Sequence, residues 1–148
     1  MNMPGDSPLE VARRLARALD ADDFDAARLL LHSDVTYRIG ADEYRGPDDV
    51  LRSYSEGSTR ARTLFDRVDF DHTVIGLMND RTVRVDFSDR LEVADDVLVH
   101  HSVQDIEVGP DSTVISIVDR PVVGQRERID AFLISHGLAR PSADAPNS

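Results

Sequence analysis

The sequence predicts an α+β domain in which helices come first and a meandering antiparallel sheet follows. Three observations predict this class. Apolar residues recur at helical spacing through the first third of the chain, and from Val68 onward their period changes to two, which is typical of strands. Turn sequences separate the alternating segments at residues 79–80, 94–96 and 109–112. The length of 148 residues fits one domain.

The N-terminal part predicts three helices and one short strand. Ser7-Pro8-Leu9-Glu10 is a capping box with proline at the first helical position, and it predicts a helix over 8–19. Asp22 or Asp23 can cap a second helix, whose apolar face runs from Phe24 to Leu31. Residues 35–39 alternate as a short strand. Gly46-Pro47 opens a third helix, which we expect to end or kink at Gly57.

The C-terminal part predicts four strands and a last helix. The strands are expected near residues 68–78, 81–93, 97–108 and 113–120, and the helix at 125–136 with Gly137 at its end. These elements make residues 8–137 a single domain, preceded by an arm over 1–7. The segment 138–148 is rich in Ala, Pro and Ser and is expected to be a disordered tail.

Two segments carry a resemblance to a known superfamily. They are residues 34–39 (Asp-Val-Thr-Tyr-Arg-Ile) with 44–50 (Tyr-Arg-Gly-Pro-Asp-Asp-Val), and the hairpin from Asp105 to Asp119. In this element order they resemble the nuclear transport factor 2-like (NTF2-like) superfamily, in particular its SnoaL-like branch. The resemblance implies a cone-shaped fold, in which a curved antiparallel sheet wraps around the N-terminal helices and leaves a pocket at its open end. The additional C-terminal helix would cap the cone or support a dimer.

Members of the superfamily include isomerases, dehydratases, epoxide hydrolases, polyketide cyclases and binding modules, so the fold alone does not assign a reaction. Ketosteroid isomerases use a base, a tyrosine and an acid. The positions that align with these three are occupied here by Ile39, Leu15 and Gln104, respectively, and none can do that chemistry.

The chain also resembles limonene epoxide hydrolases, through other residues. Those enzymes use an Arg-x-Asp string on a central strand and an Asp on the last strand. Asp119 matches the last-strand position, and Arg84-Val85-Asp86 matches the string. Counting back from the hairpin turn places that site nearer Ser88-Asp89-Arg90, where the order differs.

Charged residues also interrupt the apolar face of the predicted sheet. On the strand at 81–93 the odd positions from Val83 to Val93 are apolar except Asp89, and on 97–103 the same face is interrupted by His101. On the last strand the face ends at Asp119. A three-residue loop at 94–96 would pair residue 93 with 97 and place Asp89 opposite His101. The next hairpin would put Asp119 opposite residue 101 or 102, with a bulge near Ile106.

The row Asp89–His101–Asp119 is therefore the candidate catalytic group. Cross-strand Cβ atoms lie about 4.5–5.5 Å apart, which permits carboxylate–imidazole hydrogen bonds and proton transfer near neutral pH. The alternative is a satisfied polar contact in the core. The candidate ligand-binding residues are Tyr37, Tyr54, His72, Phe87 and Gln104.

These residues predict a largely apolar pocket that binds a small apolar or partly polar molecule. The sequence leaves open whether the molecule is turned over by acid–base chemistry, as in a hydrolase, dehydratase or isomerase. A protein-interaction module, or a homodimer through the charged outer sheet face (residues 84, 86, 88, 90 and 92), is the other alternative.

The composition of the chain limits the classes of partner and cofactor that we expect. The net charge is −11 and all 17 basic residues are arginine, which predicts no binding to nucleic acid or to anionic membranes. The absence of cysteine excludes thiolate catalysis and cysteine-bound zinc. His100 and His101 point to opposite faces of a strand, so we expect neither a metal site nor a cofactor. The N-terminus has no basic start and no apolar stretch, so a cytoplasmic location is expected.

Overall fold

The computed structural model describes residues 6–139, and its elements confirm the α+β class. Residues 1–5 of the predicted arm (1–7) and residues 140–148 of the predicted tail (138–148) lie outside the described residues. The helices are α1 (Pro8–Asp20), α2 (Phe24–Arg28), α3 (Pro47–Leu64) and α4 (Gln125–Ser135). The strands are β1 (Leu31–Ile39), β2 (Asp42–Arg45), β3 (Arg67–Leu77), β4 (Thr82–Val93), β5 (Asp96–Val108) and β6 (Val114–Arg120).

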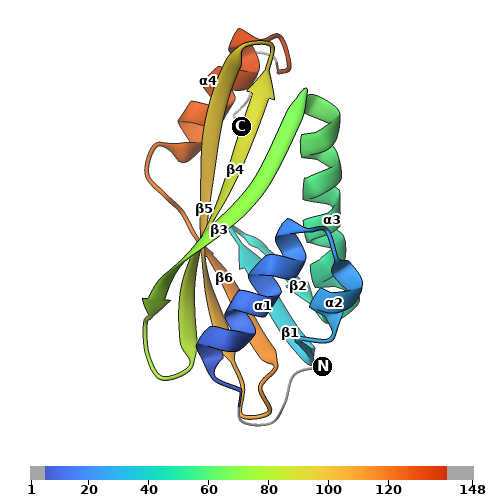
Figure 1. Cartoon of the computed structure of the whole chain (residues 1–148), viewed down its shortest axis with the longest axis vertical. Helices are drawn as coiled ribbons and strands as arrows, with labels where there is room; N and C mark the ends of the chain where they lie inside the picture. The colour runs from blue at the N-terminus through green and yellow to red at the C-terminus, as the bar shows by residue number, and fades with distance from the viewer. Residues whose placement is uncertain (1–5, 140–148) are drawn as a thin grey trace.

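The six strands form one curved sheet in the order β2-β1-β6-β5-β4-β3 (Figure 1). All neighbouring strands are antiparallel except β1 and β6, which pair in parallel. Figure 1 shows α1 crossing the lower strands, α2 next to the lower end of α3, α3 running beside β3, and α4 beside the upper end of β5. No helix in the described part of the chain is long and apolar enough to cross a membrane.

The helices differ from the prediction at two places. The second helix ends at Arg28 rather than continuing to Leu31, because Leu31 already begins β1. The third helix continues through Gly57 to Leu64. A single glycine costs a helix only about 1 kcal/mol relative to alanine, so the surrounding helix tolerates it. The sequence analysis also missed β2, a four-residue edge strand.

The core lies between α1 and the inner face of the sheet, which we define as the face that carries Val83 and Val85 of β4. Both valines are fully buried, as are Val11 and Leu15 of α1. Ser7 caps α1, since its Oγ atom accepts a hydrogen bond from the Glu10 backbone N–H over 3.2 Å. This satisfies one of the donors that a helix N-terminus leaves without a partner.

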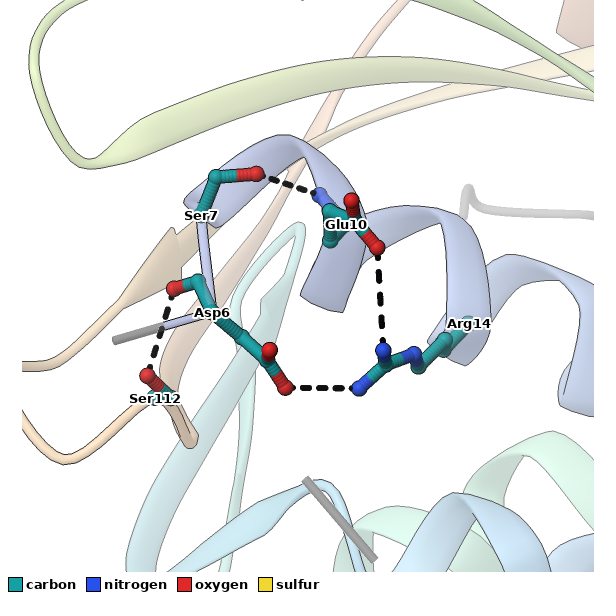
Figure 2. Close-up of polar contacts among 5 residues, drawn as sticks. All are labelled: Asp6, Ser7, Glu10, Arg14 and Ser112. Carbon is teal, nitrogen blue, oxygen red and sulfur yellow. Dashed lines mark hydrogen bonds and ion pairs between the residues drawn. The ribbon is translucent and has the colours of Figure 1, made fainter. Parts of the chain in front are cut away.

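The start of α1 is also tied to the turn between β5 and β6 (Figure 2). The Ser112 hydroxyl donates to the Asp6 carbonyl oxygen over 3.2 Å, and the Arg14 guanidinium donates to the Asp6 carboxylate over 2.7 Å. Glu10 lies 3.6 Å from the same guanidinium. These contacts fix the position at which α1 begins against the sheet.

The strand register confirms the predicted pairing of β3 with β4 and corrects the predicted pairing of β4 with β5. Phe70 lies opposite Asp89 and His72 opposite Phe87, as predicted. The loop between β4 and β5 contains two residues rather than three, because Val93 pairs with Asp96. Since side chains alternate between the faces, this one-residue difference exchanges the two faces of β5.

Candidate functional site

A pocket of about 730 Å³ opens on the inner face of the sheet. Its walls come from the ends of α1, α2 and β1, from the middle of α3, from β3, β4 and β5, and from the start of α4 (Leu19, Asp20, Asp22, Phe24, Tyr37, Ile39, Tyr44, Tyr54, Glu56, Arg60, Phe70, Phe87, Asp89, His100, Ser102, Gln104 and Arg126 among others). About half of the lining residues are polar or charged. The prediction of a largely apolar pocket was therefore wrong.

A chain of three side chains crosses one side of the pocket. The Tyr54 hydroxyl of α3 donates to Oε1 of Gln104 over 2.7 Å, and Nε2 of Gln104 donates to the Tyr37 hydroxyl oxygen over 3.1 Å. The two tyrosine rings are stacked, with centroids 5.0 Å apart and planes 4° apart. The hydrogen bonds and the stacking hold α3, β1 and β5 together at the pocket.

Burial sets the protonation of these tyrosines. Loss of hydration raises the pKa of both phenols, and the negative charge of Asp119 raises both further. Both phenols therefore stay protonated at neutral pH. Tyr37 and Tyr54 can donate and accept hydrogen bonds, but they cannot serve as phenolate bases.

Asp89 is the carboxylate of the pocket with the most perturbed titration. Burial raises its pKa from 3.8 to about 6, with a further increase from Asp20 and a decrease from His101. Its neighbour in register is His100 of β5. A carboxyl group that titrates near neutral pH can both accept and donate a proton there.

His100 shares the inner face with Asp89 and lines the pocket. Burial lowers its pKa, and the positive charges of His101 and Arg128 lower it further, while Asp119 opposes them. The imidazole is therefore neutral at pH 7, when one ring nitrogen donates and the other accepts a hydrogen bond.

The predicted partner of Asp89, His101, lies on the opposite face of β5. It pairs in register with Ser88, and its Nδ1 atom lies 3.0 Å from the Asp86 carboxylate on the outer face. The prediction that Asp89 lies opposite His101 was wrong, because the two-residue loop gives β5 the other register. Since Val97, Val99 and Val103 are apolar yet face outward, the sequence pattern favoured the wrong face.

Asp119 lies on the inner face but not opposite residue 101 or 102. Its partner in register is Gln104, and its carboxylate accepts a hydrogen bond from the Ser102 hydroxyl over 3.0 Å. The expected bulge near Ile106 is confirmed on the β6 side only, where the pairing shifts between Glu107 and Val108. The pairing of β5 with β4 is continuous.

Four of the five predicted ligand-binding residues line the pocket: Tyr37, Tyr54, Phe87 and Gln104. The fifth, His72, lies outside the lining, and its Nδ1 atom is 2.6 Å from the Asp20 carboxylate. The literal Arg84-Val85-Asp86 string does not reach the pocket, since Arg84 donates to Asp105 on the outer face.

The sequence analysis missed ten polar or charged residues of the pocket lining (Asp20, Asp22, Asp42, Ser53, Glu56, Ser58, Arg60, His100, Ser102 and Arg126). Ser102 and His100 follow from the even positions of β5 once the register is known, whereas Arg126 comes from a helix whose placement no sequence pattern indicated.

One group in the described part of the chain has the residue types of a metal site. Asp20, Asp71 and His72 bring ligand atoms within 4.8 Å of one another. Asp71 is exposed, and its carboxylate accepts a hydrogen bond from the His72 backbone N–H over 2.8 Å. The hydrogen bond between His72 and Asp20 explains why these residues lie close together, because each half-buried group satisfies the other.

Comparison with known proteins gives matches in structure only. No family model matches the chain, and no curated protein matches it in sequence. Among solved structures, a proposed SnoaL-like polyketide cyclase from Shewanella denitrificans OS-217 superimposes with a TM-score of 0.65 at 12% identity. The superposition covers 84% of this chain and 97% of that chain.

Two proteins of Mycobacterium tuberculosis are also similar. One was solved in complex with estradiol-17beta-hemisuccinate and has a TM-score of 0.60 at 14% identity, over 80% of this chain and 97% of that chain. The other is an LEH-like epoxide hydrolase with a TM-score of 0.57 at 18% identity, over 86% of this chain and 96% of that chain. At these identities the similarity establishes the fold.

Proposed function

We propose that this chain, which has the fold of the NTF2-like superfamily, binds a small organic molecule in the pocket on the inner face of its sheet. The observation that carries the proposal is a pocket of about 730 Å³ bordered by the chain Tyr54–Gln104–Tyr37. Pockets for small molecules have about 300–1,000 Å³ and a few polar groups that orient the ligand. The steroid ester bound by the structurally similar mycobacterial protein supports a ligand of that size.

Polar groups are available for orienting the ligand. Tyr54 gives its hydroxyl proton to Gln104, and the Tyr37 oxygen accepts a proton from Gln104. The two tyrosine hydroxyls also interact with each other, so Tyr37, Tyr54 and Gln104 form one polar cluster at the border of the pocket. Phe87 of β4 supplies an apolar part of the pocket wall.

The experiment uses 4-biphenylmethanol as a neutral probe and follows the backbone amides of the protein by NMR titration. We expect shift changes to concentrate on the pocket strands, β4 and β5. Phe87→Trp should weaken them, because the larger side chain occupies part of the pocket beside β4 and β5. Val99→Trp introduces the same side chain at an exposed position on the outer face and should leave binding unchanged. Equal binding to both variants, or shifts confined to the outer face, would reject the pocket.

Acid–base catalysis is a second candidate function, and the near-neutral pKa of Asp89 favours it. An ionised Asp89 would take a proton from water or from a C–H group of the ligand and return it to another atom of the same ligand. The structural similarity to an epoxide hydrolase suggests an epoxide as the first probe. Conversion of 4-vinylbiphenyl oxide to the diol should be lost in Asp89→Asn while binding persists, and equal rates would reject this role.

A further inference from the structure

The aromatic side chains of this protein are concentrated around the pocket. The chain has three Tyr and five Phe residues and no Trp. All three tyrosines line the pocket, together with Phe24, Phe70 and Phe87. Aromatic rings carry negative charge on their faces and attract a cation within about 6 Å of the ring centroid. One ring already does so, since the Arg62 guanidinium lies 5.0 Å from the centroid of Phe70.

The charges that line the pocket are predominantly negative. Its charged residues comprise five carboxylates and two guanidiniums (Asp20, Asp22, Asp42, Glu56, Asp89; Arg60, Arg126). Asp22 is paired with Arg62, and Asp20 is hydrogen-bonded to His72. Arg126 is paired with Asp130, a carboxylate outside the lining.

The remaining charges favour a positively charged ligand. In the described part of the chain, Asp42, Glu56 and Asp89 take part in no ion pair, and Arg60 is the corresponding unpaired cation. Asp42 and Glu56 are exposed, whereas Asp89 is partly buried, with Phe70 opposite it in register. A partly buried carboxylate without a cationic partner is electrostatically unfavourable, and a ligand cation would reduce that cost.

We propose that the ligand is an organic cation: an ammonium group attached to an apolar or aromatic body, with the charge placed near Asp89 and against the aromatic walls. This inference rests on the proposed binding function and specifies its ligand class. A carboxylate on the same body is disfavoured, because it would bring a further negative charge to a site where unpaired carboxylates outnumber unpaired arginines.

The test uses three probes that share the 4-biphenylmethyl body and differ in one group: trimethylammonium, hydroxyl or carboxylate. Affinities are measured by calorimetry near pH 7.5 at about 50 mM salt, so that screening does not hide the charge effect. We expect the ammonium probe to bind roughly tenfold more tightly than the alcohol, and the carboxylate to bind most weakly. The quaternary ammonium keeps its charge at every pH, so its own titration does not affect the result.

Asp89→Asn should reduce the preference for ammonium over alcohol roughly fivefold. Asp86→Asn is the matched control, because it removes the same charge from the same strand on the outer face, where Asp86 contacts His101. It should leave the preference unchanged.

The outcomes separate this inference from the binding function on which it rests. Equal binding of all three probes, or tightest binding of the carboxylate, would overturn the cation inference and leave the pocket as a binding site. The same loss of preference in Asp86→Asn and Asp89→Asn would also overturn it, since the effect would then come from net charge. Failure of all three probes to bind would contradict both proposals.

Discussion

Tyr54 on α3 donates its hydroxyl proton to Gln104 on β5 over 2.7 Å, and the two residues are 50 positions apart in the sequence. Gln104 continues the chain to Tyr37 on β1. Gln104 is only 4% exposed, so its amide depends on these two hydroxyls for its hydrogen bonds within the described structure. The same contact thus positions a helix on the sheet and presents polar atoms to the pocket.

Replacing Gln104 should therefore destabilise the protein. Gln104→Leu leaves the hydroxyls of Tyr37 and Tyr54 without their partner, and we expect a loss of roughly 2–4 kcal/mol in the free energy of unfolding. Urea denaturation measures it. The triple variant Tyr37→Phe/Tyr54→Phe/Gln104→Leu removes the polar atoms together and should recover most of the loss. A Gln104→Leu protein as stable as the parent would show that the hydrogen bonds are not formed.

Ionisation of Asp89 should lower the free energy of unfolding as the pH rises. Its pKa is about 6 in the folded protein and 3.8 is the ordinary value, so the folded state binds more protons between these values. The contribution of Asp89 to the free energy of unfolding is therefore most favourable below about pH 4. It is lost as the pH rises through 6. Since one pKa unit corresponds to about 1.36 kcal/mol, Asp89→Asn should gain up to about 3 kcal/mol relative to the parent over that window.

Denaturation of both proteins at several pH values checks this prediction. The difference between Asp89→Asn and the parent should grow from pH 4 to pH 6.5 and then level off. A difference that is constant with pH would mean that the Asp89 carboxyl group is not buried.

The contribution of Asp105 to the free energy of unfolding should depend on pH in the opposite direction. It is bound on the outer face by Arg84 over 2.8 Å and by Arg120 over 2.9 Å, and hydrogen bonding to Arg84 is the main cause that lowers its pKa. A lowered pKa stabilises the fold above about pH 4, and this contribution is lost as the pH falls below that value. Asp105→Asn should therefore be less stable than the parent at pH 7, with the difference shrinking in acid. An unchanged difference at pH 3 would contradict the assignment.

His100 and His101 should differ in their effect on ligand binding. Only His100 lines the pocket, whereas the imidazole of His101 faces Asp86. We expect His100→Gln to weaken binding of 4-biphenylmethanol severalfold and His101→Gln to leave it unchanged, as measured by calorimetry. The reverse result would restore the register that the sequence analysis predicted.

The cap of α1 can be tested at one residue. Ser7→Ala removes the hydrogen bond to the Glu10 backbone N–H and should cost about 1 kcal/mol of stability. Ser7→Asp retains a side-chain acceptor and should stay within about 0.5 kcal/mol of the parent. Thermal unfolding distinguishes the two variants. Equal melting temperatures for Ser7→Ala and the parent would mean that the cap does not contribute.

Local patterns in the sequence determined most of the elements. The capping box at Ser7 predicted the start of α1, and the period of two along residues 81–93 placed Asp89 on the same face as Val83 and Val85. These predictions succeed because caps and strand alternation depend on residues that are neighbours in the chain. The alternation therefore assigned Asp89 to the inner face without knowledge of the fold.

Which histidine accompanies Asp89 was decided by the tertiary structure. The loop between β4 and β5 is a two-residue turn in which Ala94 adopts a φ of 53°, a conformation unfavourable for alanine. Its backbone N–H donates to the Asp66 carboxylate over 2.8 Å, a contact between residues 28 positions apart. No local pattern contains that contact. Because one residue of loop length inverts the faces of a strand, it places His100 rather than His101 in the pocket.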